Sequence, residues 1–154
     1  QRCWAGTSPA PTEFWEGRGM TSDFRDQPHA RARGKAGEDD AVRWLEGQGY
    51  QILARNVTNH GGEIDVVAMD GPTLAFVEIK ARDGDRYGPA IEAVGFSKQR
   101  RLSRAAALYL TARGWHNRAC RFDVLGLDRE DGGWRYTLIR NAFPYNPGPP
   151  RRRW

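Results

Sequence analysis

The chain has 154 residues, 39% of them apolar, and a formal net charge of +5. This length and apolar content suit one domain with a modest core and exclude two compact domains. No apolar run is long enough to span a bilayer, and the first residues lack the basic and apolar stretches of a secretion signal, so we expect a soluble, cytoplasmic protein with no membrane partner.

The positive charge is unevenly distributed along the chain. Residues 34–143 hold 16 basic and 15 acidic side chains, a net charge of only +1, and much of the remaining excess lies in Arg151, Arg152 and Arg153. A general affinity for nucleic acid therefore does not follow from the total charge, and a local basic patch would be the stronger signal.

The cysteines and histidines do not have the spacing of a zinc site or a disulfide framework. Cys3 and Cys120 are far apart and neither belongs to a CxxC pair, which favours reduced thiols. The three histidines have no ligand-like spacing with each other or with a cysteine. Any metal bound by this chain is therefore expected to be held by oxygen atoms.

The first third of the chain contains an irregular segment, a helix and a strand. Residues 1–33 are rich in Gly, Pro and Arg without an apolar period, and we expect a disordered or loosely attached arm. Residues 34–49 have helical apolar spacing, acids in the first turns and a terminal glycine, which predicts a helix. Residues 50–57 alternate like a strand.

The middle of the chain is expected to form two strands and a second helix. Residues 63–69 and 74–81 are apolar on both parities, which is typical of strands buried on both faces. The apolar spacing of residues 98–113 predicts a helix, with Ser97 as its N-cap.

The last elements are two strands, at residues 121–128 and 134–141, joined by a turn. Residues 144–154 are rich in proline and arginine and are expected to form a tail outside the domain at 34–143. The order α β β β α β β predicts an α/β layer domain with a central mixed sheet flanked by helices.

Four ionisable residues interrupt the two apolar strands in the segment GGEIDVVAMDGPTLAFVEIKAR: Glu63, Asp65, Glu78 and Lys80. Burying a charge costs free energy unless the charge is paired or bound to an ion. The segment therefore contains either a matched structural network or a working site.

The turn between these strands decides which charges meet. A loop over residues 70–73, which places Pro72 outside the ladder, would pair Met69 with Leu74 and so bring Asp65 opposite Glu78 and Glu63 opposite Lys80. A two-residue Asp-Gly loop would instead leave the two carboxylates as diagonal neighbours. Adjacent carboxylates repel, and a Mg²⁺ or Mn²⁺ ion between them would relieve the conflict, with Lys80 placed to position or activate a water.

Two further groups are candidates for the same site. Glu38 lies at the edge of the apolar face of the first helix, where it is either a ligand or a favourable partner of the helix dipole. The second helix begins with the cations Lys98, Arg100, Arg101 and Arg104, and a phosphate at that end would meet both these cations and free backbone donors. A solvated basic helix start is the alternative for the arginines.

The spacing of Asp65, Glu78 and Lys80 resembles the D-x(n)-[DE]-x-K signature of the PD-(D/E)xK nuclease superfamily. A longer set of segments is similar to the YraN-like family of predicted endonucleases, which is related to archaeal Holliday junction resolvases. These segments lie within about residues 34–144 and read GKAGEDDAVRWL, ILARN, GGEIDVVAMD, FVEIKAR, AVGFSKQRRLSRAA, and RFDVLGL followed by NAF. The resemblance implies a restriction-endonuclease-like three-layer fold.

The resemblance also implies roles for single residues. Asp65 and Glu78 would bind the metal, with the Ile79 carbonyl as a further ligand, and Lys80 would assist the attacking water. Glu38 matches the acid of the first helix, and Lys98 or Gln99 matches the polar contribution of the later helix. One departure is Ile64, which stands where a proline often precedes the first acid.

Three interpretations follow from the sequence. The first is a Mg²⁺-dependent DNA endonuclease, acting on branched or repair DNA, which would need a homodimer to cut a junction symmetrically. The second is a nucleic-acid-binding module with a nuclease-like fold and little or no activity. The third is a structural network in which Glu63 pairs with Lys80 and Asp65 binds backbone donors, although this would leave Glu78 uncompensated.

Overall fold

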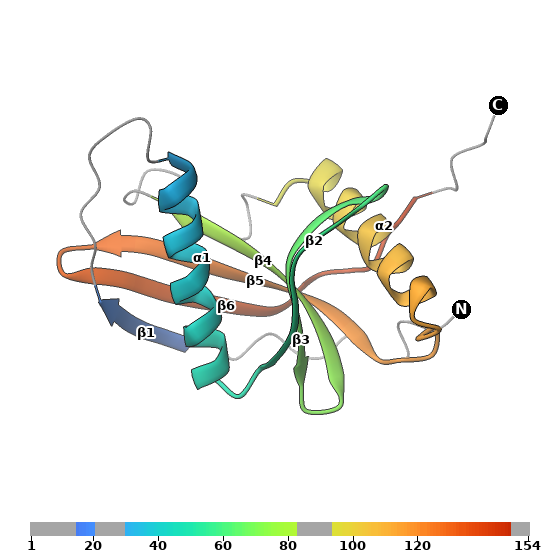
Figure 1. The fold of residues 1–154 in the computed structure, drawn as a ribbon, viewed down its shortest axis with the longest axis horizontal. Coiled ribbons are helices and arrows are strands. Elements are labelled where there is room, and N and C mark those ends of the chain that lie inside the picture. Colours follow the sequence, from blue (N-terminus) through green and yellow to red (C-terminus); the bar gives the residue numbers. More distant parts are fainter. Residues whose placement is uncertain (1–14, 21–29, 83–93, 149–154) are drawn as a thin grey trace.

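The computed structural model describes residues 15–20, 30–82 and 94–148, which form six strands and two helices (Figure 1). The expected order α β β β α β β is present, with one additional strand before it. The elements are β1 (Trp15–Met20), α1 (Ala30–Gly47), β2 (Gln51–Asn59), β3 (Gly62–Asp70), β4 (Thr73–Arg82), α2 (Phe96–Ala112), β5 (Cys120–Glu130) and β6 (Gly133–Phe143).

The strands form one mixed sheet in the order β1-β6-β5-β4-β3-β2. β4 and β5 are parallel, and every other neighbouring pair is antiparallel. The parallel pair requires a crossover connection, which includes α2. The expected mixed sheet is therefore confirmed, and the candidate charges lie on its neighbouring strands β3 and β4.

Part of the expected N-terminal arm has regular structure. Residues 15–20 form β1, which pairs with β6 from Trp15–Leu138 to Met20–Gly133, and residues 30–33 begin α1. The expectation of an irregular arm is corrected at these residues, because pairing to the edge of β6 supplies backbone partners that no side-chain pattern in residues 15–20 indicates. Residues 1–14 and 21–29 lie outside the described residues, as do residues 83–93 and 149–154.

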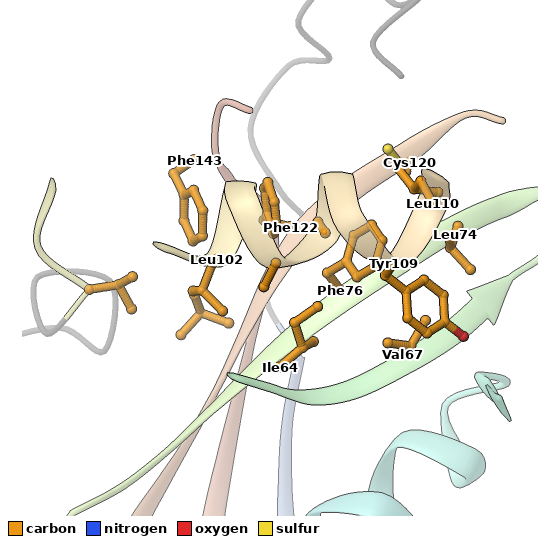
Figure 2. Close-up of a cluster of buried hydrophobic side chains, with 14 residues drawn as sticks. Ile64, Val67, Leu74, Phe76, Leu102, Tyr109, Leu110, Cys120, Phe122 and Phe143 are labelled. Atoms are coloured by element: carbon orange, nitrogen blue, oxygen red, sulfur yellow. The ribbon is translucent and has the colours of Figure 1, made fainter. Parts of the chain in front are cut away.

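The two helices cover opposite faces of the sheet. One core cluster contains the α2 residues Leu102 and Tyr109 with Phe76 and Phe122 from the sheet (Figure 2). The other contains the α1 residues Ala41 and Leu45 with the odd-numbered β4 residues Ala75 and Val77. Because side chains alternate along β4, even-numbered residues face α2 and odd-numbered residues face α1. This gives the expected three-layer arrangement, with β4 buried on both faces.

The start of α2 differs from the expectation. The helix begins at Phe96, its N-cap is Gly95, and no side chain caps it. Ser97 is therefore within the first turn and is not the N-cap. The backbone amide of Gln99 bonds the Gly95 carbonyl at 3.0 Å, which shows that the first turn closes two residues earlier than the serine suggests.

The turn between β2 and β3 packs against the middle of α2. The Asn59 side-chain amide donates to the Ala105 carbonyl at 3.0 Å, and a Cβ built on Gly61 would lie 2.5 Å from the Ala105 nitrogen. Gly61 therefore allows a contact between two backbones that no larger residue permits. This contact holds the start of β3 against α2, the helix that covers the sheet face of Glu78.

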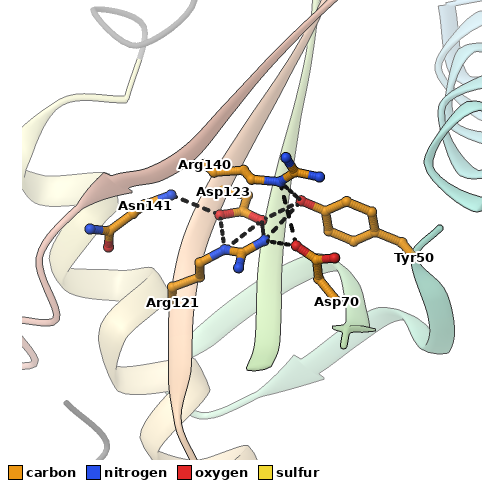
Figure 3. A network of polar contacts seen from close by, with 6 residues as sticks. All are labelled: Tyr50, Asp70, Arg121, Asp123, Arg140 and Asn141. Carbon is orange, nitrogen blue, oxygen red and sulfur yellow. Dashed lines mark hydrogen bonds and ion pairs between the residues drawn. The ribbon is translucent and has the colours of Figure 1, made fainter. Parts of the chain in front are cut away.

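A buried polar network ties β5 and β6 to the start of β2 (Figure 3). Asp123, which is fully buried, accepts bonds from the Arg121 guanidinium, the Tyr50 hydroxyl and the Asn141 backbone amide, each at 2.9 Å. Asn141 has a positive φ of 50°, and the β5–β6 register shifts between Phe122 and Val124. The carboxylate of Asp123 thus satisfies a backbone donor that the irregular ladder leaves open.

Residues 144–148 have no regular structure, as expected for this part of the tail, and they lie against α2. The Asn146 backbone amide donates to the buried Ser103 hydroxyl at 2.9 Å. Within the described part of the chain, neither helix has the length and apolar character that crossing a membrane would require.

Candidate functional site

The β3–β4 hairpin brings Asp65 and Glu78 together. The strands pair from Asp70–Thr73 through Met69–Leu74 to Val66–Val77, which is the register expected from the position of Pro72. The paired ladder ends there, and the Ile79 backbone amide instead donates to Asp65 Oδ2 at 2.8 Å. The Asp65 side chain therefore takes the place of a backbone acceptor where the two strands separate.

Glu78 is the centre of a small charge cluster on the α2 face of the sheet. Its side chain is only 3% exposed. Lys80 Nζ lies 3.2 Å and Lys98 Nζ 3.0 Å from the same oxygen, Glu78 Oε1. Lys80 comes from the same strand face and Lys98 from the first turn of α2, so sheet and helix together deliver two cations to one carboxylate oxygen.

The second oxygen of Glu78 has a different environment. Glu78 Oε2 is buried. When Asp65 is ionised, this oxygen receives no hydrogen bond from the described residues. Burial, followed by the negative charge of Glu78, raises the pKa of Asp65 to about 7. A hydrogen bond to Glu78 also favours the protonated form, whereas the Ile79 amide and the charge of Lys98 favour the ionised one. The carboxyl pair thus holds either a proton or another cation near neutral pH.

This arrangement fits a divalent cation. Mg²⁺ is commonly held by one or two carboxylates while waters and phosphate oxygens complete its coordination. Asp65 and Glu78 supply two carboxylates, and within the described part of the chain the buried Glu78 Oε2 has no donor when Asp65 is ionised. Among residues 15–20, 30–82 and 94–148, no three His, Cys, Asp or Glu side chains form a group that could hold a metal. The Ile79 peptide adjoins the cluster through its amide.

Two acids that the sequence placed near this site lie elsewhere. Glu38 is half-buried on α1, and α1 packs on the sheet face opposite to Glu78, so the structure does not bring Glu38 together with Asp65 and Glu78. Glu63 is exposed, and within the described chain it forms no ion pair with Lys80, whose partner is Glu78. The expected Glu63–Lys80 pair is wrong because β3 and β4 separate beyond Val66 and Val77.

The cations at the start of α2 have unequal positions. Lys98 binds Glu78, and the Gln99 side-chain amide donates to the Val94 carbonyl at 2.8 Å. Arg100 and Arg101 are exposed, and Arg104 is half-buried. The sequence therefore correctly placed Lys98 on the helix face that packs on the sheet. It predicted a role in nucleic-acid binding for Lys98, whose ion-pair partner in the structure is the buried Glu78. The helical spacing of Lys98 with Leu102 and Tyr109 was the available signal.

The raised pKa of Asp65 predicts a specific pH dependence of stability without metal. The ordinary pKa is 3.8 and the folded value is about 7, so between these values the folded state binds a proton that the unfolded state has lost. The Asp65 carboxyl therefore contributes to the free energy of unfolding at low pH, and this contribution is lost as pH rises toward 7. We expect the Tm in EDTA to fall between pH 5 and pH 7.5 more steeply for the wild type than for Asp65→Asn. Equal slopes for the two proteins would contradict the assignment.

Comparison with known proteins gives consistent matches over the region that contains this site. Residues 37–127 match the model of a family described as "Uncharacterised protein family UPF0102". A UPF0102 protein of Symbiobacterium thermophilum is 50% identical over 115 residues, which cover 74% of this chain and 98% of that protein. UPF0102 proteins of Syntrophus aciditrophicus and Pseudomonas putida are 43% and 41% identical, over 71% of this chain and 87% and 91% of their own lengths.

Proposed function

The chain belongs to the UPF0102 family, and we propose that its Asp65–Glu78 site makes it a divalent-cation-dependent endonuclease that hydrolyses phosphodiester bonds in DNA. The observation that carries this proposal is the pairing of two carboxyl groups at the end of a buried ladder. Among the described residues, Glu78 Oε2 has no donor unless Asp65 carries a proton. If the two residues served only to stabilise the fold, an apolar pair would suit this position better, because it has no buried charge to compensate.

The residues around this pair have the properties that phosphodiester hydrolysis needs. A bound Mg²⁺ or Mn²⁺ ion would offset the negative charge of the phosphate and make a water more acidic. Asp65 and Glu78 would hold that ion, and the amide of Ile79 keeps the Asp65 carboxylate oriented. Lys80 is 28% exposed, so its ammonium can both contact Glu78 and orient an attacking water by hydrogen bonding.

The choice of nucleic acid as substrate rests on the start of α2. Arg100 and Arg101 are exposed, two and three residues after Lys98, and the first turn of the helix presents backbone amides without a side-chain cap. Both features favour phosphate groups. A polymer with regularly spaced phosphates would contact these arginines while one of its phosphates lies at the carboxylate pair.

A second candidate function is a DNA-binding module that does not cut. Lys80 and Lys98 already neutralise Glu78 through its Oε1 atom, so the cluster is electrostatically compensated in part without a metal. A chain that uses the site only for fold stability and binds DNA through its arginines would show the same contacts. Metal binding at the carboxylate pair distinguishes the two functions.

We expect saturating Mn²⁺ or Mg²⁺ to raise the Tm by several degrees, because an ion that binds only the folded state stabilises it by mass action. Asp65→Asn should remove the increase, since an amide is a much weaker ligand than a carboxylate. Glu63→Gln is a matched control, because it removes an exposed acid from the same strand and should retain the shift. Thermal melts with increasing metal measure this, and equal shifts in wild type and Asp65→Asn would refute the metal site.

A further inference from the structure

The first residue of α2 is an exposed aromatic side chain next to the candidate site. Phe96 is 80% exposed, whereas the other exposed large apolar residues of the described chain, Leu53 and Leu108, are 40% and 43% exposed. The preceding apolar residue, Val94, is buried at 2%. Within the described part of the chain, Val94 therefore anchors this end of the helix and the ring of Phe96 stays largely uncovered.

Phe96 lies in cationic surroundings. Lys98, two residues later, contacts Glu78, and Arg100, one helical turn later, is exposed. The Arg100 guanidinium lies beside Gly148, where an added Cβ would be 2.5 Å from one of its terminal nitrogens. A planar apolar ring with a guanidinium one turn away suits a ligand that has both flat apolar faces and negative charge, which is the chemistry of a nucleotide.

Resting on the proposed function, we propose that Phe96 stacks on an unpaired nucleobase of DNA and so directs the site to substrates with single-stranded segments. Bases in an intact duplex are stacked on each other and are not available to a ring at a helix end. Stacking on an aromatic side chain is tolerant of sequence, because every base has a flat face. One ring among cations offers too little apolar area for a stable protein interface, which needs hundreds of square ångströms per partner.

The helix geometry is consistent with one substrate reaching both features. Phe96 and Lys98 are two residues apart in the first turn of α2, and an α-helix with its side chains is about 10–12 Å across. A nucleotide strand that crosses the start of the helix can therefore present a base to Phe96 and a nearby phosphate to the carboxylate pair. The exposed Arg100 would contact the backbone between them.

The test is DNA binding in EDTA, which separates this inference from cleavage. The probe is a fluorescein-labelled single-stranded oligodeoxynucleotide of mixed sequence, compared with the same sequence as a blunt duplex by fluorescence anisotropy. Phe96→Ala should weaken single-strand binding by about tenfold and leave duplex binding unchanged. Phe96→Trp should retain single-strand affinity, and Phe96→Leu should not, because the interaction requires a flat ring.

Leu108→Ala is the matched control, since it removes an exposed apolar side chain from the opposite end of the same helix and should change neither affinity. The proposal is overturned if Phe96→Ala binds the single strand as the wild type does, or if it weakens single-strand and duplex binding equally. It is also overturned if Phe96→Ala lowers the Tm without changing affinity, because the ring would then be covered by the protein itself. A chain that passes this test but cuts no DNA would refute the nuclease proposal alone.

Discussion

Asp123→Ala is expected to lower the free energy of unfolding by about 3–5 kcal/mol, the range for removing one partner of a buried charged pair. Asp123 is fully buried, and its carboxylate accepts bonds from Arg121, Tyr50 and the Asn141 amide. The substitution removes the principal counter-charge of the half-buried Arg121 guanidinium. It also removes the acceptor of the Asn141 backbone amide. Chemical denaturation at neutral pH measures the loss.

The controls for Asp123 use the same network. Asp123→Asn keeps an acceptor of the same shape and should destabilise less than the alanine variant. Asp70→Asn alters a partner of Arg121 whose side chain is 27% exposed, so solvent compensates and the effect should be smaller still. Burial raises the pKa of Tyr50 to about 12, so its hydroxyl remains a donor to Asp123 across the working pH range. Equal stability of all three variants would contradict this assignment.

Glu78→Gln is expected to reduce DNA cleavage by about 10²-fold or more, a loss comparable to that from removing one group that stabilises developing charge. The amide has nearly the shape of the carboxylate but lacks its charge, so it should hold a cation poorly. Lys80→Ala should lower cleavage by about 10²–10⁴-fold through loss of the group that orients the water. Both variants should bind DNA as the wild type does, because Arg100 and Arg101 are unchanged.

Stability measurements must accompany these two variants. Glu78→Gln leaves Lys80 and Lys98 without their common acceptor charge, although both are partly exposed and can be hydrated. The expected pattern is therefore a cooperative melt and retained DNA affinity with lost cleavage. Cleavage that persists at the wild-type rate in both variants would place the chemistry elsewhere or in a contaminant.

The central strands and their register were predictable because they depend on local rules. A proline cannot donate to a ladder, so the position of Pro72 set the turn and gave the Met69–Leu74 pairing seen in the structure. Strand alternation then put Asp65, Glu78 and Lys80 on one face. The proximity of Asp65, Glu78 and Lys80 follows from these two rules, whereas the contact of Glu78 with Lys98 depends on the packing of α2.

The remaining features depend on long-range geometry that sequence patterns do not contain. The ladder was expected to continue to Glu63 and Lys80, but the packing of Gly61 on α2 accompanies the separation of β3 from β4 before that point. Glu38 lies away from Glu78 because α1 packs on the opposite face of the sheet. The apolar periodicity of a helix predicts which side of the helix is buried, but not which face of the sheet it covers. The pairing of β1 with β6 and the Asp123 network join residues more than 70 positions apart.

The structural alternative takes a different form in the structure from the one that the sequence indicated. The structural alternative required Glu63 to neutralise Lys80, and the structure gives Lys80 to Glu78 instead. Asp65 does accept a backbone amide, as that alternative expected. Burial and the negative charge of Glu78 nevertheless raise the pKa of Asp65, although the amide favours its ionised form. Lys80 and Lys98 offset the charge of Glu78 through Oε1, and a metal ion in place of the shared proton would compensate Asp65 as well.

The most direct test of the central claim is a cleavage assay on a panel of DNA structures. The wild-type chain is incubated with fork, junction, single-stranded and linear duplex DNA in the presence of Mn²⁺, beside Asp65→Asn and an EDTA control. We expect cleavage of at least one substrate that contains unpaired nucleotides, and loss of that cleavage in Asp65→Asn and in EDTA. Absence of cleavage on every substrate, or equal cleavage by the wild type and Asp65→Asn, would contradict it.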